Sequence, residues 1–150
     1  MFDRFTERAK TIISHAEDLC ADSSSPESRT KHFLTAMIAE PRGIAGHVLR
    51  DRAVDANSIS ATPTLTMPDA TLSEIANAAT SAAVWLGHNY PGTEHLLLGL
   101  CNLPHSHAFV CLQTLEAPPL NICQDVLEIL GHHDDWELSL IHISEPTRPY

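Results

Sequence analysis

The chain has 150 residues and a mass of 16.4 kDa, enough for one globular domain to bury a core without disulfides or a metal. Its 9 Lys and Arg residues face 19 Asp and Glu residues, a formal net charge of −10, which argues against a nucleic-acid or anionic-membrane partner. No apolar run approaches the ~18 residues of a membrane span, and charged residues interrupt the first ten positions, where a signal peptide would begin. The four cysteines form no C-x-x-C pair and lie in apolar patterns, which predicts buried, reduced thiols in a cytoplasmic protein: Cys20, Cys101, Cys111 and Cys123.

Apolar residues recur with helical spacing along most of the chain. We predict N-caps at Thr6 and Asp69 and a C-cap at Gly131. No alternating strand pattern appears, and the prolines and threonines of Ala61–Pro68 favour a linker, so the fold class is all-α. The predicted helices are Thr6–Cys20, Lys31–Ala39, Ile44–Arg52, a short helix ending near Ile59, Leu72–Leu86, Glu94–Asn102, His107–Leu115 and Leu120–Leu130.

An internal repeat sets the expected architecture. Shifting the chain by 63 residues without gaps aligns identical residues, and eight of these pairs are Ile12/Ile75, Ala16/Ala79, Thr30/Thr93, His32/His95, Leu34/Leu97, Pro41/Pro104, Ala45/Ala108 and Leu49/Leu112. Each half cannot bury its apolar faces alone, so we expect two pseudo-symmetric four-helix repeats packed into one domain, repeat 1 over about 1–61 and repeat 2 over about 69–131. The helices after Thr30 and Thr93 should form the central pair, with these side chains among the most buried: Phe33, Leu34, Met37, Leu97 and Leu100.

Two segments carry a resemblance to a known family. They are Phe2–Ala9 (FDRFTERA) and Leu86–Leu100 (LGHNYPGTEHLLLGL). Together they resemble the amino-terminal, Clp repeat domain of Clp-type AAA+ unfoldases, closest to the ClpC kind, over about residues 1–131. The doubled four-helix repeat of that family fits the 63-residue offset.

The resemblance implies a docking module for protein quality control. Such domains are tethered above an ATPase ring and receive substrate or adaptor proteins, and some ClpC relatives bind phosphoarginine through the glutamate of each GTEH motif. On this chain Glu94 would pair with the guanidinium, while Thr93 at a helix N-terminus would hold the phosphate. Asp69, as the cap of a neighbouring helix, would repel the phosphate and weaken the site. The first repeat has Lys31 in place of the glutamate and should have lost its site, which the exchange Lys31→Glu would restore.

Other classes of function are weighed against this one. Ten histidines invite a metal-binding enzyme, but His105-x-His107 and the run His132–Asp135 lack zinc-ligand spacing, so we expect no metal and no cofactor. No Walker motif is present, so the chain itself should not bind ATP or act as an enzyme. A truncated fragment of an unfoldase is the favoured origin, and a stand-alone adaptor-like protein is the alternative.

The end of the chain is unusual. Residues 132–150 are predicted to be a disordered tail that adds no stability. Within them, Leu138–Arg148 (LSLIHISEPTR) resembles a translated sequencing adapter, so 138–150 are predicted to be non-native.

Overall fold

Eight helices make up most of the residues described by the computed structural model, which are 2–22, 28–63 and 65–131. No strand occurs within those ranges, so the predicted all-α class is confirmed. The predicted tail at 132–150 lies outside them. The helices are α1 (Glu7–Asp22), α2 (Arg29–Ala39), α3 (Ile44–Asp51), α4 (Ala56–Ala61), α5 (Leu72–Trp85), α6 (Thr93–Cys101), α7 (His107–Thr114) and α8 (Pro119–Ile129).

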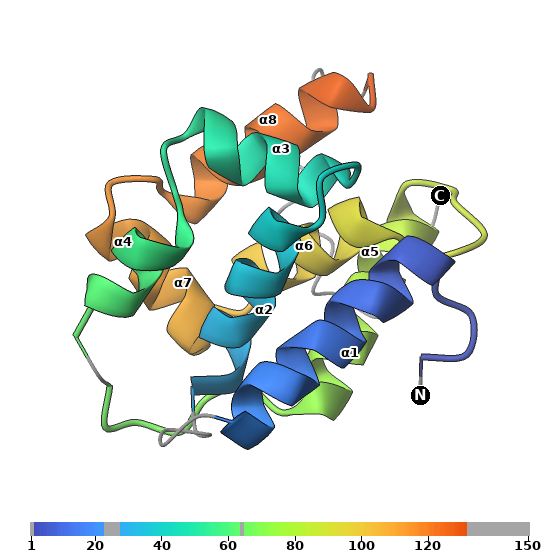
Figure 1. The fold of residues 1–150 in the computed structure, drawn as a ribbon. Helices are drawn as coiled ribbons and strands as arrows, with labels where there is room; N and C mark the ends of the chain where they lie inside the picture. Colours follow the sequence, from blue (N-terminus) through green and yellow to red (C-terminus); the bar gives the residue numbers. More distant parts are fainter. Residues whose placement is uncertain (1, 23–27, 64, 132–150) are drawn as a thin grey trace.

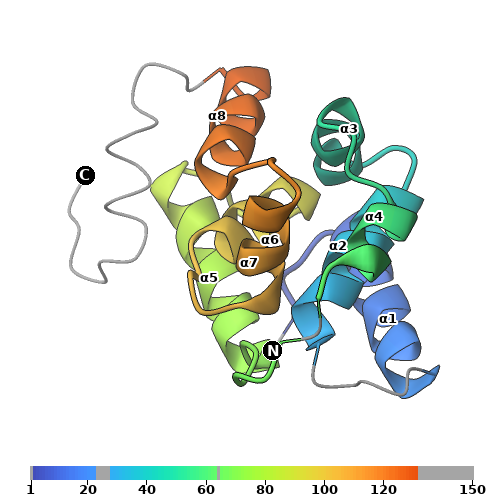
Figure 2. The same cartoon turned by 90° about the vertical axis from the view of Figure 1, so that its left-hand side faces the viewer.

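The two halves of the chain pack side by side. Figure 2 shows α1–α4 on one side and α5–α8 on the other, with α2 and α6 in the middle. Within the halves, α1 packs along α2 and α5 along α6; between them, α3 lies against α6 and α8, and α2 lies against α7 (Figure 1). The predicted pair of four-helix repeats is therefore the observed architecture.

The core is continuous across both halves. The predicted central residues are all fully buried, and each has a relative exposure of 0%: Phe33, Leu34, Met37, Leu97 and Leu100. Such burial contributes about 1.5–3 kcal/mol per large side chain. All four cysteines are also buried, as their apolar surroundings predicted.

One of the predicted N-caps is right and one is wrong. The Thr6 hydroxyl accepts the Ala9 amide at 3.2 Å and so caps α1. Asp69 does not cap α5; Thr71 does, through a reciprocal capping box with Glu74. A Thr-x-x-Glu signature supplies two bonds to the helix end, and it places the cap two residues after Asp69 while α5 still begins at the predicted Leu72.

Gly99 lets α5 and α6 approach closely. A Cβ atom at this position would lie 2.9 Å from the Ala79 amide nitrogen and 3.1 Å from the Ala78 carbonyl carbon. These are backbone atoms, so the helices would have to move apart. We expect Gly99→Ala to lower the free energy of unfolding by about 1–3 kcal/mol in urea denaturation. Ser81→Ala, on the exposed face of α5, is the control and should change stability by less than about 0.5 kcal/mol.

Candidate anion-binding hollow at the start of α6

A surface hollow lies where the N-terminal ends of α1, α3 and α6 meet. Its volume is about 920 Å³. The Thr6 amide, just before α1, donates a hydrogen bond to the Pro91 carbonyl, just before α6, at 2.9 Å. This bond holds the starts of the two helices close together. We call this opening the α6 hollow; its walls include Thr6, Glu7, Arg8, Arg42, Ile44, His88, Gly92, Thr93 and Glu94.

Two predicted site residues, Thr93 and Glu94, line this hollow together. Thr93 is the first residue of α6 and is buried, and its hydroxyl accepts the Ala45 amide from the first turn of α3 at 3.5 Å. The N-termini of two helices therefore converge on one threonine. Because first-turn amides have no partner within their helix, they leave donors and partial positive charge at this point.

The Glu94 side chain lies back over Gly92. A Cβ atom on Gly92 would come within 2.5 Å of the Glu94 carboxylate oxygen, so the absence of a side chain there makes room for it. No hydrogen bond or ion pair joins this carboxylate to another of the described residues, and Glu94 is half-buried. The hollow thus pairs unused amide donors with an unpaired carboxylate.

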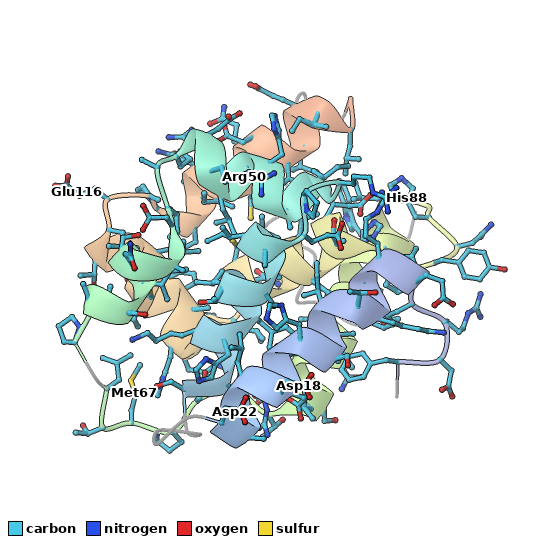
Figure 3. All side chains as sticks on the ribbon, viewed as in Figure 1. Asp18, Asp22, Arg50, Met67, His88 and Glu116 are labelled. Atoms are coloured by element: carbon cyan, nitrogen blue, oxygen red, sulfur yellow. The ribbon has the colours of Figure 1, made fainter. Side chains whose placement is uncertain are left out.

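His95 fixes the loop that precedes α6. Its Nδ1 accepts the Gly92 amide at 2.8 Å, so the ring proton is on Nε2, which lies 2.7 Å from Nδ1 of His88. Figure 3 shows His88 at this end of the molecule, beyond α5. The role of His95 is therefore structural, with its ring accepting a hydrogen bond from a backbone amide. Helical spacing gave no sign of the contact with His88.

The burial of His95 predicts acid sensitivity. Desolvation, with a smaller contribution from His88, lowers the pKa of His95 from 6.5 to about 4. Below pH 6.5 the unfolded chain therefore binds a proton at His95 that the folded chain does not bind. The free energy of unfolding should fall by about 2–3 kcal/mol as the pH is lowered from about 6.5 to 4. In urea denaturation at several pH values, His95→Gln should flatten that fall, whereas His15→Gln, an exposed control, should keep it. An unchanged slope in His95→Gln would contradict this assignment.

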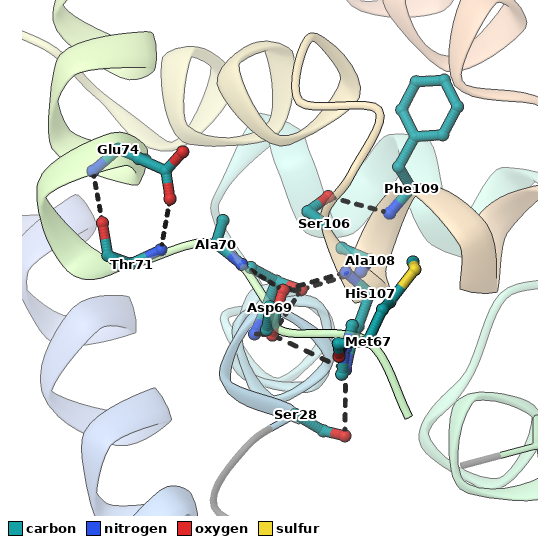
Figure 4. A network of polar contacts seen from close by, with 11 residues as sticks. Ser28, Met67, Asp69, Ala70, Thr71, Glu74, Ser106, His107, Ala108 and Phe109 are labelled. Carbon is teal, nitrogen blue, oxygen red and sulfur yellow. Dashed lines mark hydrogen bonds and ion pairs between the residues drawn. The ribbon is translucent and has the colours of Figure 1, made fainter. Parts of the chain in front are cut away.

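The third predicted site residue, Asp69, is not part of the α6 hollow. Its carboxylate accepts the Thr30 amide at 2.8 Å and the His107 amide at 2.9 Å, at the start of α2 and α7 (Figure 4). The prediction that Asp69 sits beside Glu94 and repels a ligand there is therefore wrong, because Asp69 lies at the counterpart place in the other repeat. That place also carries Lys31, directly after Thr30.

The sequence reasoning missed two arginines at the rim. Arg8 of α1 and Arg42, just before α3, line the α6 hollow, and the Arg8 guanidinium donates to the Arg42 carbonyl at 3.3 Å. The motif LGHNYPGTEH predicts a site at the start of α6 and gives no indication of residues from α1 or α3. Only the packing of α1 and α3 against it brings these cations to the same opening.

Ser28, His107 and Asp69 are close together but are arranged as a structural network. The Ser28 hydroxyl lies 3.3 Å from Nδ1 of His107, and the other ring nitrogen donates to the Met67 carbonyl at 2.7 Å. Both nitrogens are engaged and His107 is fully buried, so this ring cannot act as a base for an incoming substrate. No cluster of three metal-ligating side chains occurs among the described residues, and His105 pairs with Glu74 at 2.9 Å.

Comparison with known proteins identifies the class. Residues 4–64 match the Clp repeat (R) N-terminal domain family. The fold matches the crystal structure of the N-terminal domain of the chaperone ClpD from Arabidopsis thaliana, with a TM-score of 0.59 and 23% identity over 87% of this chain and 99% of that one. The resemblance to Clp N-terminal domains is thus confirmed, in sequence over residues 4–64 and in fold over 87% of the chain.

Curated relatives refine the comparison. The chain is 32% identical over 147 residues to the chloroplastic chaperone protein ClpC of Pisum sativum, a match over 90% of this chain and 16% of that protein. It is 29% identical over 146 residues to a probable ATP-dependent Clp protease ATP-binding subunit of Chlamydia pneumoniae, with 87% and 17% covered. The chain thus spans about a sixth of the length of these relatives. Among its described residues, no helix is long and apolar enough to cross a membrane.

Proposed function

We propose that the chain is the substrate- and adaptor-docking domain of a ClpC-like unfoldase and works in protein quality control. Repeat 1 (about 1–61), a linker (61–68) and repeat 2 (about 69–131) form the docking unit, which itself is not catalytic. ATP-driven unfolding would be supplied by AAA+ modules of a longer parent protein. The relatives that span six times its length, a chaperone and a protease subunit among them, support this proposal.

The α6 hollow supports a more specific ligand, a phosphoarginine side chain on the docked protein. Phosphoarginine carries a guanidinium next to a phosphate. The unpaired Glu94 carboxylate suits the guanidinium, and the amides at the starts of α3 and α6 beside the Thr93 hydroxyl suit the phosphate. The juxtaposition of these two opposite features in one opening is the observation that carries the proposal.

Calorimetric titration of the full chain with free phosphoarginine tests this ligand directly. We expect one site, of modest affinity, because the opening is wide and the acidic Glu7 and Glu40 share its walls with the two arginines. Arginine without the phosphate should bind at least tenfold more weakly. Binding of both compounds with equal affinity, or of neither, would overturn the phosphoarginine assignment.

A stand-alone adaptor is the second candidate. It would use the same hollow but dock an unfoldase ring rather than form part of one. The two candidates differ in whether this domain is part of the same polypeptide as an ATPase. Walker motifs encoded in the same reading frame would establish the unfoldase. Either protein would work in the cytoplasm, in keeping with four buried, unpaired thiols, and neither would need nucleic acid or a membrane as partner.

A further inference from the structure

One carboxylate at the starts of α2 and α7 is held as a bound anion would be. The side chain of Asp69 is 4% exposed. Its oxygens accept from the Thr30 amide (2.8 Å), the Thr30 hydroxyl (2.8 Å) and the His107 amide (2.9 Å), in addition to the adjacent Ala70 amide (2.7 Å). Figure 4 shows these bonds converging from two helix starts on one side chain. The convergence compensates for burying the charge.

The same donors exist at the pseudo-symmetric position, the starts of α6 and α3. A shift of 63 residues relates Thr30 to Thr93, His107 to Ile44 and Ala108 to Ala45. The relation holds in space: the Ala108 amide donates to the Thr30 hydroxyl at 2.7 Å, and the Ala45 amide donates to the Thr93 hydroxyl at 3.5 Å. Each of these threonines therefore joins the second helix of one repeat to the third helix of the other.

The two sets of donors differ in the side chain that lies next to them. Thr6 stands at the position that corresponds to Asp69, and its hydroxyl is used to cap α1. In the described part of the chain, no side-chain oxygen accepts from the amides of Thr93 or Ile44, and the α6 hollow opens beside them. The donors that Asp69 occupies at the starts of α2 and α7 therefore lie beside an open hollow at the starts of α6 and α3.

We infer that the starts of α2 and α7 form a second oxyanion site between the repeats, which Asp69 closes from within as an internal ligand. The ligand class is set by the donors: a carboxylate or phosphate group with at least two oxygens. Because Lys31 replaces the glutamate, this site has no partner for a guanidinium and is specific for the anion alone. The comparison of the two sets of donors rests on the proposed binding of phosphate in the α6 hollow. Whether Asp69 occupies its own set of donors can be tested without that proposal.

The test uses inorganic phosphate and backbone amide NMR on the full chain. In Asp69→Thr, which places threonine at both related positions, the amide signals of Thr30 and His107 should shift as phosphate is added. They should not shift in the native chain or in the remote control Asp18→Thr. A folded Asp69→Thr whose Thr30 and His107 signals ignore phosphate would overturn the inference. Thr93 and Ile44 report separately on the α6 hollow, so a failure there would count against the proposed function alone.

Hydrogen exchange on the native chain covers the case in which Asp69→Thr does not fold. The amides of Thr30 and His107 donate to an internal carboxylate and should exchange at least tenfold more slowly than those of Thr93 and Ile44. Equal exchange in the two pairs would show that Asp69 does not occupy the site in solution. This measurement needs no ligand.

The reciprocal substitution, a carboxylate in place of Thr6, should occupy the donors in the α6 hollow. Thr6→Asp places a carboxylate beside the α6 hollow, whereas Thr6→Asn caps α1 equally well without the charge. Thr6→Asp should lose the phosphate-induced shifts of Thr93 and Ile44, and Thr6→Asn should keep them. Loss in both variants, or in neither, would contradict the equivalence of the two positions.

Discussion

Glu94→Gln should weaken phosphoarginine binding at least tenfold, the largest effect on binding that we expect from any single exchange. The amide keeps the shape of the side chain but removes the negative charge that faces the guanidinium. Glu94 is half-buried and has no other partner among the described residues, so its charge is available to a ligand. A tenfold loss corresponds to about 1.4 kcal/mol, within the range for a partly desolvated charge pair. Calorimetry of the variant against the native chain measures it.

Glu116→Gln is the matched control for net charge. It lies at the opposite end of the molecule from His88 (Figure 3) and should leave the affinity unchanged. If Glu94→Gln bound phosphoarginine as tightly as the native chain does, Glu94 would have no part in the site.

The first repeat should not gain this ligand from a change at Lys31 alone. Lys31→Ala should not reduce binding, because Lys31 lies in the other repeat. The sequence suggested that Lys31→Glu would restore a second site, but Asp69 already occupies the donors there. We therefore expect a second site only when Lys31→Glu is combined with Asp69→Thr.

The helices could be predicted from the sequence because their signals are local. Apolar spacing and the 63-residue repeat located all eight, and the seven predicted starts fall within two residues of the observed ones or coincide with them. The start of α5 coincided in spite of the wrong cap, since the apolar run itself begins at Leu72. The capping box of Thr71 and Glu74 was readable in the sequence and outweighs a lone aspartate two residues earlier.

The site could be predicted only in part. Thr93 and Glu94 are adjacent in a recognisable motif, so their proximity follows from the chain itself. Asp69 and Thr30 are 39 residues apart, and His107 is 38 residues further on, so their meeting depends on how the repeats pack. The repeat nevertheless held a clue: Asp69 aligns with Thr6, and a carboxylate that stands where the other copy has a hydroxyl marks the position at which the two halves diverge.

Asp69→Ala should cause the largest loss of stability of any single exchange discussed. It leaves the Thr30 amide, the Thr30 hydroxyl and the His107 amide without the acceptor that now joins α2 to α7 across the two repeats. Each unsatisfied buried group costs about 1–3 kcal/mol, and water entering the vacated space recovers part of this, so we expect a net loss of about 3 kcal/mol. Urea denaturation at neutral pH measures the loss.

Two companion variants separate the charge of Asp69 from its shape. Asp69→Asn keeps one acceptor oxygen and should lose about half as much stability, whereas Asp18→Ala, on the exposed face of α1, should change it by less than about 0.5 kcal/mol. Added inorganic phosphate should return part of the lost stability to Asp69→Ala but not to Asp69→Asn, because only the alanine leaves room for an oxyanion among the donors. If Asp69→Ala were as stable as the native chain, the carboxylate would not be what holds the starts of α2 and α7 together.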